Sequence, residues 1–285
     1  MAELSIIIPV FNEERAIQKT VHEIQNALKR VKSPSEIILV NDGSTDTTPA
    51  ILKKISGVRV LMHGKNKGYG AALKTGICHA SGKWILIVDA DGTYPIDAIP
   101  TLLKDTAKFD MVVGSRTGEN VHIPFFRRPA KWFLNRLVTY LTGTQIPDLN
   151  SGLRVFKKEI ADRFFHLFPE GFSFTTTITV ACLTNGYSVK FVPINYYKRK
   201  GKSTMRPHQF FAFLQLILRL ITYFKPLNFF LPLSVLFVLV GALRMVRDYW
   251  VQNSFGIGGV TVVLAGIQIF MIGLLADLII HRTKL

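Results

Sequence analysis

The amino-acid sequence predicts an α/β protein with a mostly parallel, doubly wound sheet. Short apolar runs of strand length alternate along the first 115 residues with longer helix-like stretches, at the spacing of βαβ units. Each apolar run ends in polar or glycine-containing residues. Because ligands of such sheets bind outside the carboxyl ends of the strands, the alternation predicts the place of a site as well as the fold.

The predicted elements follow one another along the chain. The strands are predicted at residues 4–8, 36–40, 84–88 and 110–113. Helices are predicted at 13–31 and at 95–108, the second with a proline in its first turn. Residues 65–70 contain two glycines but lack the spacing of a dinucleotide-binding loop. They either offer backbone N–H groups and lysines to a diphosphate, or simply begin a helix.

Asp89 and Asp91 directly follow the run at residues 84–88. Two carboxylates one residue apart at a buried strand end suit a hard divalent cation, Mg²⁺ or Mn²⁺, that also binds phosphate oxygens. A turn with two solvated aspartates is the alternative. Other predicted strands also end in polar residues, among them Asn12 and Asp42, and this recurrence favours a site.

Three motifs, in this order and spacing, resemble the inverting family-two glycosyltransferases, which have the Rossmann-like GT-A fold. They read I-I-I-P-V-F-N-E-E, N-D-G-S-T-D and V-D-A-D-G-T-Y-P. Two downstream motifs, D-L-N-S-G-L-R-V-F and R-K-G-K-S, resemble a narrower group, the polyprenyl-phosphate glycosyltransferases. That group includes dolichyl-phosphate mannose synthases and bacterial polyprenyl-phosphate hexosyltransferases. The resemblance covers residues 3–225 by motif.

The resemblance implies a metal-dependent hexosyltransferase that moves a sugar from GDP-mannose or a UDP-hexose to polyprenyl or dolichyl phosphate. It implies that the catalytic residues are Asp89, Asp91 and Arg116, with Asp89 and Asp91 as ligands of Mg²⁺ or Mn²⁺. The implied donor-binding residues are Pro9, Asn12, Glu13, Asp42, Lys67, Gly68, Asp89 and Arg199. The implied acceptor-phosphate residues are Arg116, Arg127, Lys131, Asn150, Ser151 and Ser203. Asp148 and Arg154 would shape the acceptor side.

The sequence departs from the mannose synthases at two positions. Thr93 stands where those enzymes tend to have glutamine or a similar amide, and Thr204 stands where many have lysine. The first departure weakens the expectation of a third metal contact from Thr93. Both argue against mannose as the transferred sugar.

The positive charge is concentrated in the middle of the chain. Of a net charge of +16, residues 121–225 account for +12, with 16 Lys and Arg against 4 Asp and Glu. Such a segment indicates a polyanionic partner, which is a nucleic acid, a phosphorylated substrate or an anionic lipid surface. The sequence that follows favours the lipid surface over the nucleic acid.

Two uncharged stretches, 227–243 and 254–276, follow the basic segment. At about 1.5 Å per residue, the second is long enough for a hydrocarbon core of about 30 Å. We therefore expect a hairpin of two transmembrane helices, at about 227–246 and 256–280, although buried core helices are the alternative. Amphipathic stretches at 128–142 and 206–225 are expected to lie at the membrane interface. The predicted organisation is a catalytic domain at 1–205, the interfacial helix at 206–225 and the hairpin at 226–285.

Basic residues on either side of the hairpin favour a cytosolic catalytic domain on a cytoplasmic or endoplasmic-reticulum type of membrane. Gln268 within the second span suggests association into a homo-oligomer. Two alternatives remain. A processive family-two polysaccharide synthase would carry a Q-x-x-R-W motif and more spans than this chain has. A basic nucleic-acid-binding membrane protein is supported by charge alone.

Overall fold

The computed structural model describes residues 2–31, 33–118, 136, 138–140, 142–171, 173–197, 222–223, 225–254 and 256–283. The chain divides into two compact units, Met1–Met205 and Arg206–Leu285. The expected interfacial helices fall largely outside the described residues, although residues 136, 138–140 and 142 of the first are helical. The assignment of the three predicted segments to catalysis, interface and membrane stays a prediction.

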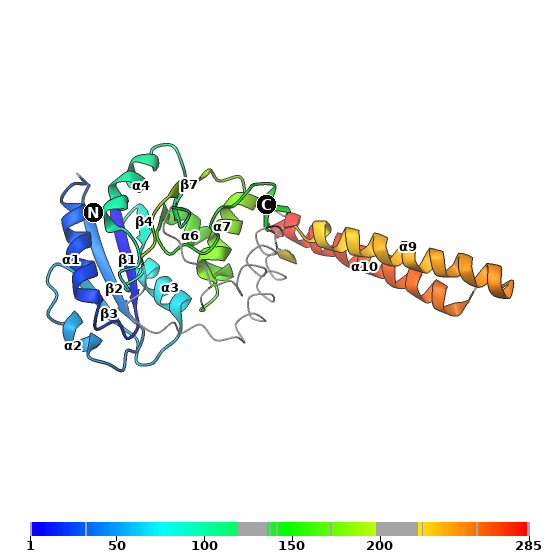
Figure 1. Cartoon of the computed structure of the whole chain (residues 1–285), viewed down its shortest axis with the longest axis horizontal. Helices are drawn as coiled ribbons and strands as arrows, with labels where there is room; N and C mark the ends of the chain where they lie inside the picture. Colours follow the sequence, from blue (N-terminus) through cyan, green and yellow to red (C-terminus); the bar gives the residue numbers. More distant parts are fainter. Residues whose placement is uncertain are drawn as a thin grey trace. The chain divides into compact units, whose positions relative to one another are not determined.

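Among its described residues, the first unit contains one mixed sheet of seven strands in the order β3-β2-β1-β4-β6-β5-β7 (Figure 1). The strands are β1 (Leu4–Val10), β2 (Ser35–Asn41), β3 (Arg59–Met62), β4 (Trp84–Ile87), β5 (Met111–Ser115), β6 (Arg154–Lys157) and β7 (Val189–Pro193). Strand β6 is antiparallel to both β4 and β5, whereas the other neighbouring strands of this sheet pair in parallel. The mostly parallel sheet predicted from the sequence is confirmed.

The helices of the first unit connect and flank these strands. They are α1 (Ile17–Leu28), α2 (Thr48–Leu52), α3 (Tyr69–His79), η1 (Ile96–Ala98), α4 (Ile99–Asp105), α6 (Lys158–Phe164), η3 (Phe165–Leu167) and α7 (Phe174–Thr184). The helix predicted at 13–31 begins only at Ile17. Residues before it form a turn in which Asn12 has a left-handed backbone (φ 54°), so the first turn of the predicted helix is absent.

The central strand β1 is buried on both faces, as expected for a strand that is apolar throughout. Successive side chains of a strand point to opposite faces. Ile6 and Ile8 belong to the core that includes Val21 of α1, whereas Ile7 lies against α3, where a Cβ at Gly76 would meet its Cγ2 at 2.4 Å. Helices on both faces leave the carboxyl edge of the strands as the place for polar groups.

The described part of the second unit is a hairpin of two long helices, α9 (Pro226–Gln252) and α10 (Ile257–Thr283). Three glycines of α10, seven residues apart, allow close packing against α9. A Cβ would lie 2.4 Å from a Met245 carbon at Gly259, 2.8 Å from a Val238 carbon at Gly266 and 2.6 Å from a Phe230 carbon at Gly273. The predicted hairpin is confirmed.

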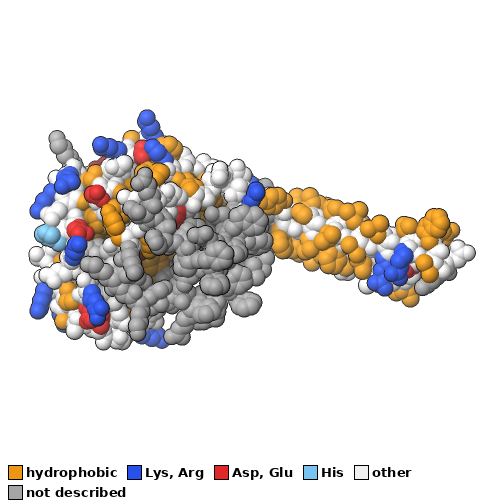
Figure 2. Space-filling view, viewed as in Figure 1, with side chains coloured by type: hydrophobic (Ala, Val, Ile, Leu, Met, Phe, Trp, Pro, Cys, Tyr) orange, Lys and Arg blue, Asp and Glu red, His pale blue; other side chains and the backbone are white. Residues whose placement is uncertain are grey.

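The hairpin is apolar on its outside as well as between its helices. The segments Pro226–Val251 and Ile257–Ile280 have mean hydropathies of 2.3 and 2.4, yet only 11% of each 18-residue window is buried. Figure 2 shows that hydrophobic side chains predominate on the visible face of the hairpin, with a group of basic side chains near its far end. Core helices of a soluble protein would be mostly buried, so both helices have the length and exposed apolar surface of membrane spans.

Candidate active site at the carboxyl ends of the strands

The loops that follow β1 and β2 are tied together by side-chain hydrogen bonds. Oδ1 of Asn12 accepts a bond from the backbone N–H of Thr45 (2.8 Å), and the backbone N–H of Asn12 donates to Ser44 Oγ (3.0 Å). The backbone N–H of Glu13 donates to Thr48 Oγ1 at 3.0 Å. These bonds end β1 in a fixed turn and place Asn12 and Glu13 at the carboxyl edge of the sheet.

Asp42, which follows β2, organises the loop that follows β3. Its carboxylate is almost fully buried and accepts bonds from the backbone N–H groups of Lys67 (2.9 Å) and Gly68 (2.8 Å). Oδ1 also lies 2.7 Å from Nδ1 of His63, whose Nε2 is 3.0 Å from Thr75 Oγ1 on α3. The structure therefore shows Asp42 as the anchor of residues 63–68, and its predicted contact with the donor stays a prediction.

The amino end of α3 is already bonded within the protein. The backbone N–H of Gly70 donates to the carbonyl of Gly171 (3.2 Å), and that of Ala71 donates to the carbonyl of Glu170 (2.9 Å). The two preceding loop N–H groups are held by Asp42. This arrangement favours an ordinary helix start over a diphosphate cradle, because these four donors are used by protein acceptors.

Asp89 and Asp91 follow β4, and one oxygen of each carboxylate is held by a neutral hydroxyl. The Tyr69 hydroxyl donates to Asp89 Oδ1 (2.8 Å), and the Thr93 hydroxyl donates to Asp91 Oδ1 (2.7 Å). Burial raises the pKa of Tyr69, and Asp89 raises it further, so this hydroxyl remains a donor. Gly152 lies against the other side of Asp89, where a Cβ would sit 2.5 Å from Oδ2.

The aspartate pair fits a divalent cation by its chemistry. Tyr69 and Thr93 are neutral donors, so neither of these two bonds cancels a carboxylate charge. Mg²⁺ typically uses one or two carboxylates, several waters and substrate phosphates. In the part of the chain that the structure describes, no group of three or more His, Cys, Asp or Glu residues could hold a metal. Mg²⁺ bound by Asp89 and Asp91 would have coordination positions for water and a substrate diphosphate.

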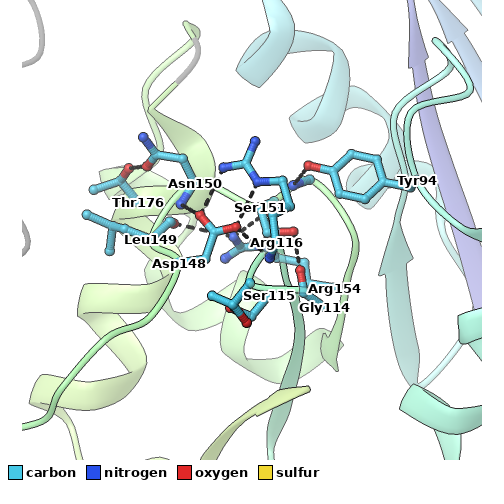
Figure 3. A network of polar contacts seen from close by, with 12 residues as sticks. Tyr94, Gly114, Ser115, Arg116, Asp148, Leu149, Asn150, Ser151, Arg154 and Thr176 are labelled. Atoms are coloured by element: carbon cyan, nitrogen blue, oxygen red, sulfur yellow. Dashed lines mark hydrogen bonds and ion pairs between the residues drawn. The ribbon is translucent and has the colours of Figure 1, made fainter. Parts of the chain in front are cut away.

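Arg116, one residue beyond β5, forms a bidentate ion pair with Asp148 (Figure 3). Its Nε donates to Oδ2 at 2.7 Å and its Nη2 to Oδ1 at 2.9 Å, while its backbone N–H also donates to Oδ2. Its guanidinium lies 5.2 Å from the ring centre of Tyr196. Burial alone would lower the pKa of Arg116, but Asp148 raises it above its ordinary value. Arg116 is thus a fixed cation whose Nη1 is not engaged with Asp148.

Asn150 and Ser151, both predicted at the acceptor phosphate, have different surroundings. Asn150 is exposed, and its Oδ1 accepts a bond from the Thr176 hydroxyl on α7 (2.5 Å). Ser151 is fully buried, and its hydroxyl donates to the carbonyl of Gly114 on β5 (2.5 Å). The predicted phosphate contact of Ser151 does not fit this placement, because its hydroxyl is used inside the sheet and no solvent reaches it.

Arg154, expected to shape the acceptor side, is instead a fully buried support at the start of β6. Its Nε donates to the carbonyl of Ser151 (3.0 Å), and its Nη1 donates to the Thr175 carbonyl (2.9 Å) and the Thr179 hydroxyl (2.8 Å) on α7. Burial lowers the pKa of Arg154. Its bonds join the turn at 148–152 to α7 and hold that turn beside β4.

The remaining predicted residues divide into two groups. Pro9 is buried inside β1, and Lys67 is exposed beside the carboxyl edge. Four others lie outside the described residues: Arg127, Lys131, Arg199 and Ser203. Sequence reasoning missed a set of supporting residues, namely His63, Tyr69, Gly152 and Thr176, which contact predicted residues, and Tyr94, which holds Gly152. Of these, Tyr94 lies within the V-D-A-D-G-T-Y-P motif and Gly152 within D-L-N-S-G. Their position inside these motifs is the sequence feature that could have indicated a role at the site.

Comparison with known proteins assigns a family to this fold and site. Residues 5–165 match the family model described as glycosyl transferase family 2. The chain belongs to this family. Residues 225–281, which contain α9 and all but the last two residues of α10, match a second model, the GtrB C-terminal hairpin.

A curated relative is undecaprenyl-phosphate 4-deoxy-4-formamido-L-arabinose transferase of Sodalis glossinidius (strain morsitans). It is 30% identical over 169 residues, which are 58% of this chain and 52% of that protein. The chain thus spans about half the length of this relative.

Solved structures of glucosyl-3-phosphoglycerate synthase from Mycobacterium tuberculosis share the fold. The complex with Mn²⁺, UDP and glucosyl-3-phosphoglycerate has a TM-score of 0.59 and 19% identity, over 78% of each chain. The complex with UDP has a TM-score of 0.60 and 20% identity, over 78% of this chain and 79% of that one. Together with the mixed sheet, this likeness confirms the predicted GT-A fold.

Proposed function

We propose that this family-two glycosyltransferase moves a sugar from a nucleoside diphosphate sugar to polyprenyl phosphate, with inversion at the anomeric carbon. The sugar is a hexose, and the donor is GDP-mannose or a UDP-hexose. The observation that carries the proposal is the Asp89 and Asp91 pair at the end of β4 in a chain that also has the apolar hairpin. The curated relative, whose name gives undecaprenyl phosphate as its acceptor, supports the same acceptor class.

The reaction needs charge stabilisation more than it needs a strong base. The second pKa of a phosphate monoester is about 6, so the acceptor is largely ionised at pH 7. Its oxygen attacks the anomeric carbon while the bond from that carbon to the diphosphate breaks, and the nucleoside diphosphate leaves with the electron pair. A bound Mg²⁺ or Mn²⁺ would neutralise the leaving diphosphate. Asp89 and Asp91 are the residues that would hold it.

The donor diphosphate and the acceptor phosphate are both negatively charged and must come close together. Cationic side chains are needed to offset the repulsion between them. Arg116 is oriented by Asp148 through two bonds, and its Nη1 is not engaged with that carboxylate. We assign Arg116 to the acceptor phosphate near the reacting centre. Arg127 and Lys131, in the basic middle of the chain, are assigned to the same phosphate.

The hairpin and the basic segment suit an enzyme whose acceptor is a membrane lipid. Both helices are long and apolar enough to cross a bilayer, and basic residues precede the first span and follow the second. By the positive-inside rule, the catalytic unit lies on the cytosolic side.

The test is an incubation of the full chain in membranes with polyprenyl phosphate and a panel of nucleotide sugars. The panel contains GDP-mannose, UDP-hexoses and a UDP-linked 4-deoxy-4-formamido-pentose, with Mg²⁺ or Mn²⁺ present. The expected product is a lipid-linked monosaccharide, and the matched control is Asp91→Asn. Sugar polymer in place of the lipid product would indicate a processive synthase. Retention on heparin without metal-dependent binding of any sugar nucleotide would indicate a nucleic-acid-binding protein.

A further inference from the structure

We propose that Tyr69 is a positioning residue for the metal site, which sets the orientation of the Asp89 carboxylate through its hydroxyl. This inference rests on the proposed function. Tyr69 is the first residue of α3, and its hydroxyl donates to Asp89 Oδ1 at 2.8 Å. It is a neutral side chain from a different βα unit than the aspartate pair, and it reaches the carboxylate across the carboxyl edge of the sheet.

The backbone around Tyr69 is held at three places. The N–H group of Gly68, the residue before it, donates to Asp42 Oδ2 at 2.8 Å. The N–H groups of Gly70 and Ala71, the residues after it, donate to carbonyls of the loop before α7 at 3.2 and 2.9 Å. A tyrosine on so constrained a backbone has little freedom to move its hydroxyl. The hydroxyl therefore serves as a fixed point to which the carboxylate is aligned.

The Asp89 carboxylate is confined from the opposite side as well. At Gly152 a Cβ would lie 2.5 Å from Oδ2 and 2.7 Å from both Cγ and Oδ1, so the carboxylate rests directly on the glycine backbone. Gly152 is itself held, because its N–H donates to the Tyr94 hydroxyl at 2.6 Å. Between Gly152 and Tyr69, rotation about the Cβ–Cγ bond of Asp89 is restricted.

Asp91, unlike Asp89, is oriented by a neighbouring residue of its own turn. Its Oδ1 accepts bonds from the hydroxyl (2.7 Å) and backbone N–H (3.1 Å) of Thr93, two residues further along the same turn. Tyr69, in contrast, holds Asp89 from twenty residues away. The geometry of the aspartate pair thus depends on how the loop after β3 is placed, and Asp42 and His63 place that loop.

The physical consequence is a defined change in metal affinity. Groups that hydrogen-bond to metal ligands fix the orientation of those ligands, and their loss typically lowers metal affinity by about 10- to 100-fold. Tyr69→Phe removes one hydroxyl, keeps the ring and leaves the Asp89 charge in place. We expect the dissociation constant for Mn²⁺ to rise by at least about 10-fold. A purely structural role would lower the unfolding temperature without this change in affinity.

The experiment measures Mn²⁺ binding directly, from the electron paramagnetic resonance signal of free Mn²⁺, in full-length protein in detergent with UDP or GDP. Four proteins are compared: wild type, Tyr69→Phe, Asp91→Asn and Tyr187→Phe. Tyr187 is the matched control because its hydroxyl accepts a bond from Arg163 at 3.2 Å and contacts neither aspartate. Thermal unfolding of each protein is recorded alongside, and turnover is measured as a function of Mn²⁺ concentration.

The proposal expects weakened Mn²⁺ binding in Tyr69→Phe, unchanged binding in Tyr187→Phe and a turnover that recovers toward wild type as Mn²⁺ is raised. Wild-type affinity in Tyr69→Phe would overturn the role of Tyr69 while leaving the proposed function intact. A turnover defect that persists at saturating Mn²⁺, with normal affinity, would also overturn it. If the wild-type protein binds no Mn²⁺, or if Asp91→Asn binds Mn²⁺ as tightly as the wild type does, the proposed function fails and this inference fails with it.

Discussion

Gly152→Ala is expected to damage the proposed metal site by adding a single methyl group. The glycine does not occupy the left-handed region of backbone conformation, so alanine is allowed there and the effect is steric. A Cβ would lie 2.5 Å from Asp89 Oδ2 and 2.7 Å from Cγ, whereas ordinary van der Waals contact begins at 3.4 Å. Either the Asp89 carboxylate or the backbone at residue 152 must therefore move.

The carboxylate is the group that moves, because the backbone at Gly152 and at the residue before it is held by hydrogen bonds. Its N–H donates to Tyr94, and the preceding residue, Ser151, is fixed by its bond to Gly114 and by the bonds from Arg154. The required shift is about 0.7–0.9 Å. A misplacement of about 1 Å can lower a rate by about 100-fold. Overpacking a filled site lowers the free energy of unfolding by about 1–3 kcal/mol.

The assay measures kcat/KM for lipid product, the Mn²⁺ dissociation constant and the unfolding temperature for Gly152→Ala and for Gly64→Ala. The second variant is the control, because a Cβ at Gly64 would meet nothing within 4 Å. We expect a loss of about 100-fold in kcat/KM and weaker Mn²⁺ binding for the first variant alone. Gly152→Ala with wild-type turnover and Mn²⁺ affinity would refute the argument that the position of Asp89 controls the reaction.

Three further perturbations test other parts of the proposal. Asp91→Asn keeps the shape of the side chain, so we expect a folded protein whose turnover falls by orders of magnitude. A chelator should abolish the activity of the wild-type protein. Full activity of Asp91→Asn in metal-free buffer would contradict the proposed metal site. A charge-assisted bond to phosphate contributes about 1.5–3 kcal/mol, so Arg127→Ala or Lys131→Ala should lower kcat/KM for the acceptor by about 10- to 150-fold at fixed ionic strength, with little change in the donor KM. The opposite pattern would reverse their roles. Deletion of residues 226–285 should release the protein from membranes only in part; a wholly soluble product that uses long-chain acceptors normally would refute the interfacial helix at 206–225.

Strands β1, β2, β4 and β5 could be predicted because each is an apolar run that is mostly buried, whereas the partly exposed β3 and β7 were not predicted. A run such as that of β1 has to be buried on both sides, and a buried strand followed by a helix implies a parallel neighbour. Strand β6 escaped prediction for the opposite reason. It has four residues, of which the first and last are Arg154 and Lys157, and it is antiparallel to both neighbours. Nothing in its composition indicates that it inserts between β4 and β5.

The aspartate pair of the candidate site was predictable, because carboxylates directly after a buried strand lie at a known edge of the sheet. Residue type alone could not separate Asn150 from Ser151. Both are small polar residues in one motif, yet one is exposed and the other has its hydroxyl buried against Gly114. The register of β6 decides which of them faces the solvent, so their roles depend on an element that the sequence pattern did not reveal.

The same register explains why the D-x-D and D-L-N-S-G motifs belong to one site. Pairing of Ile87 on β4 with Arg154 on β6 places Gly152, two residues earlier, beside Asp89, two residues later. A carboxylate that rests on a glycine backbone cannot be recognised in either motif alone, because the contact exists only between them. It follows that the proposed metal site has two parts. The carboxylates come from the turn after β4, and the surface that keeps Asp89 in place comes from the turn before an antiparallel strand.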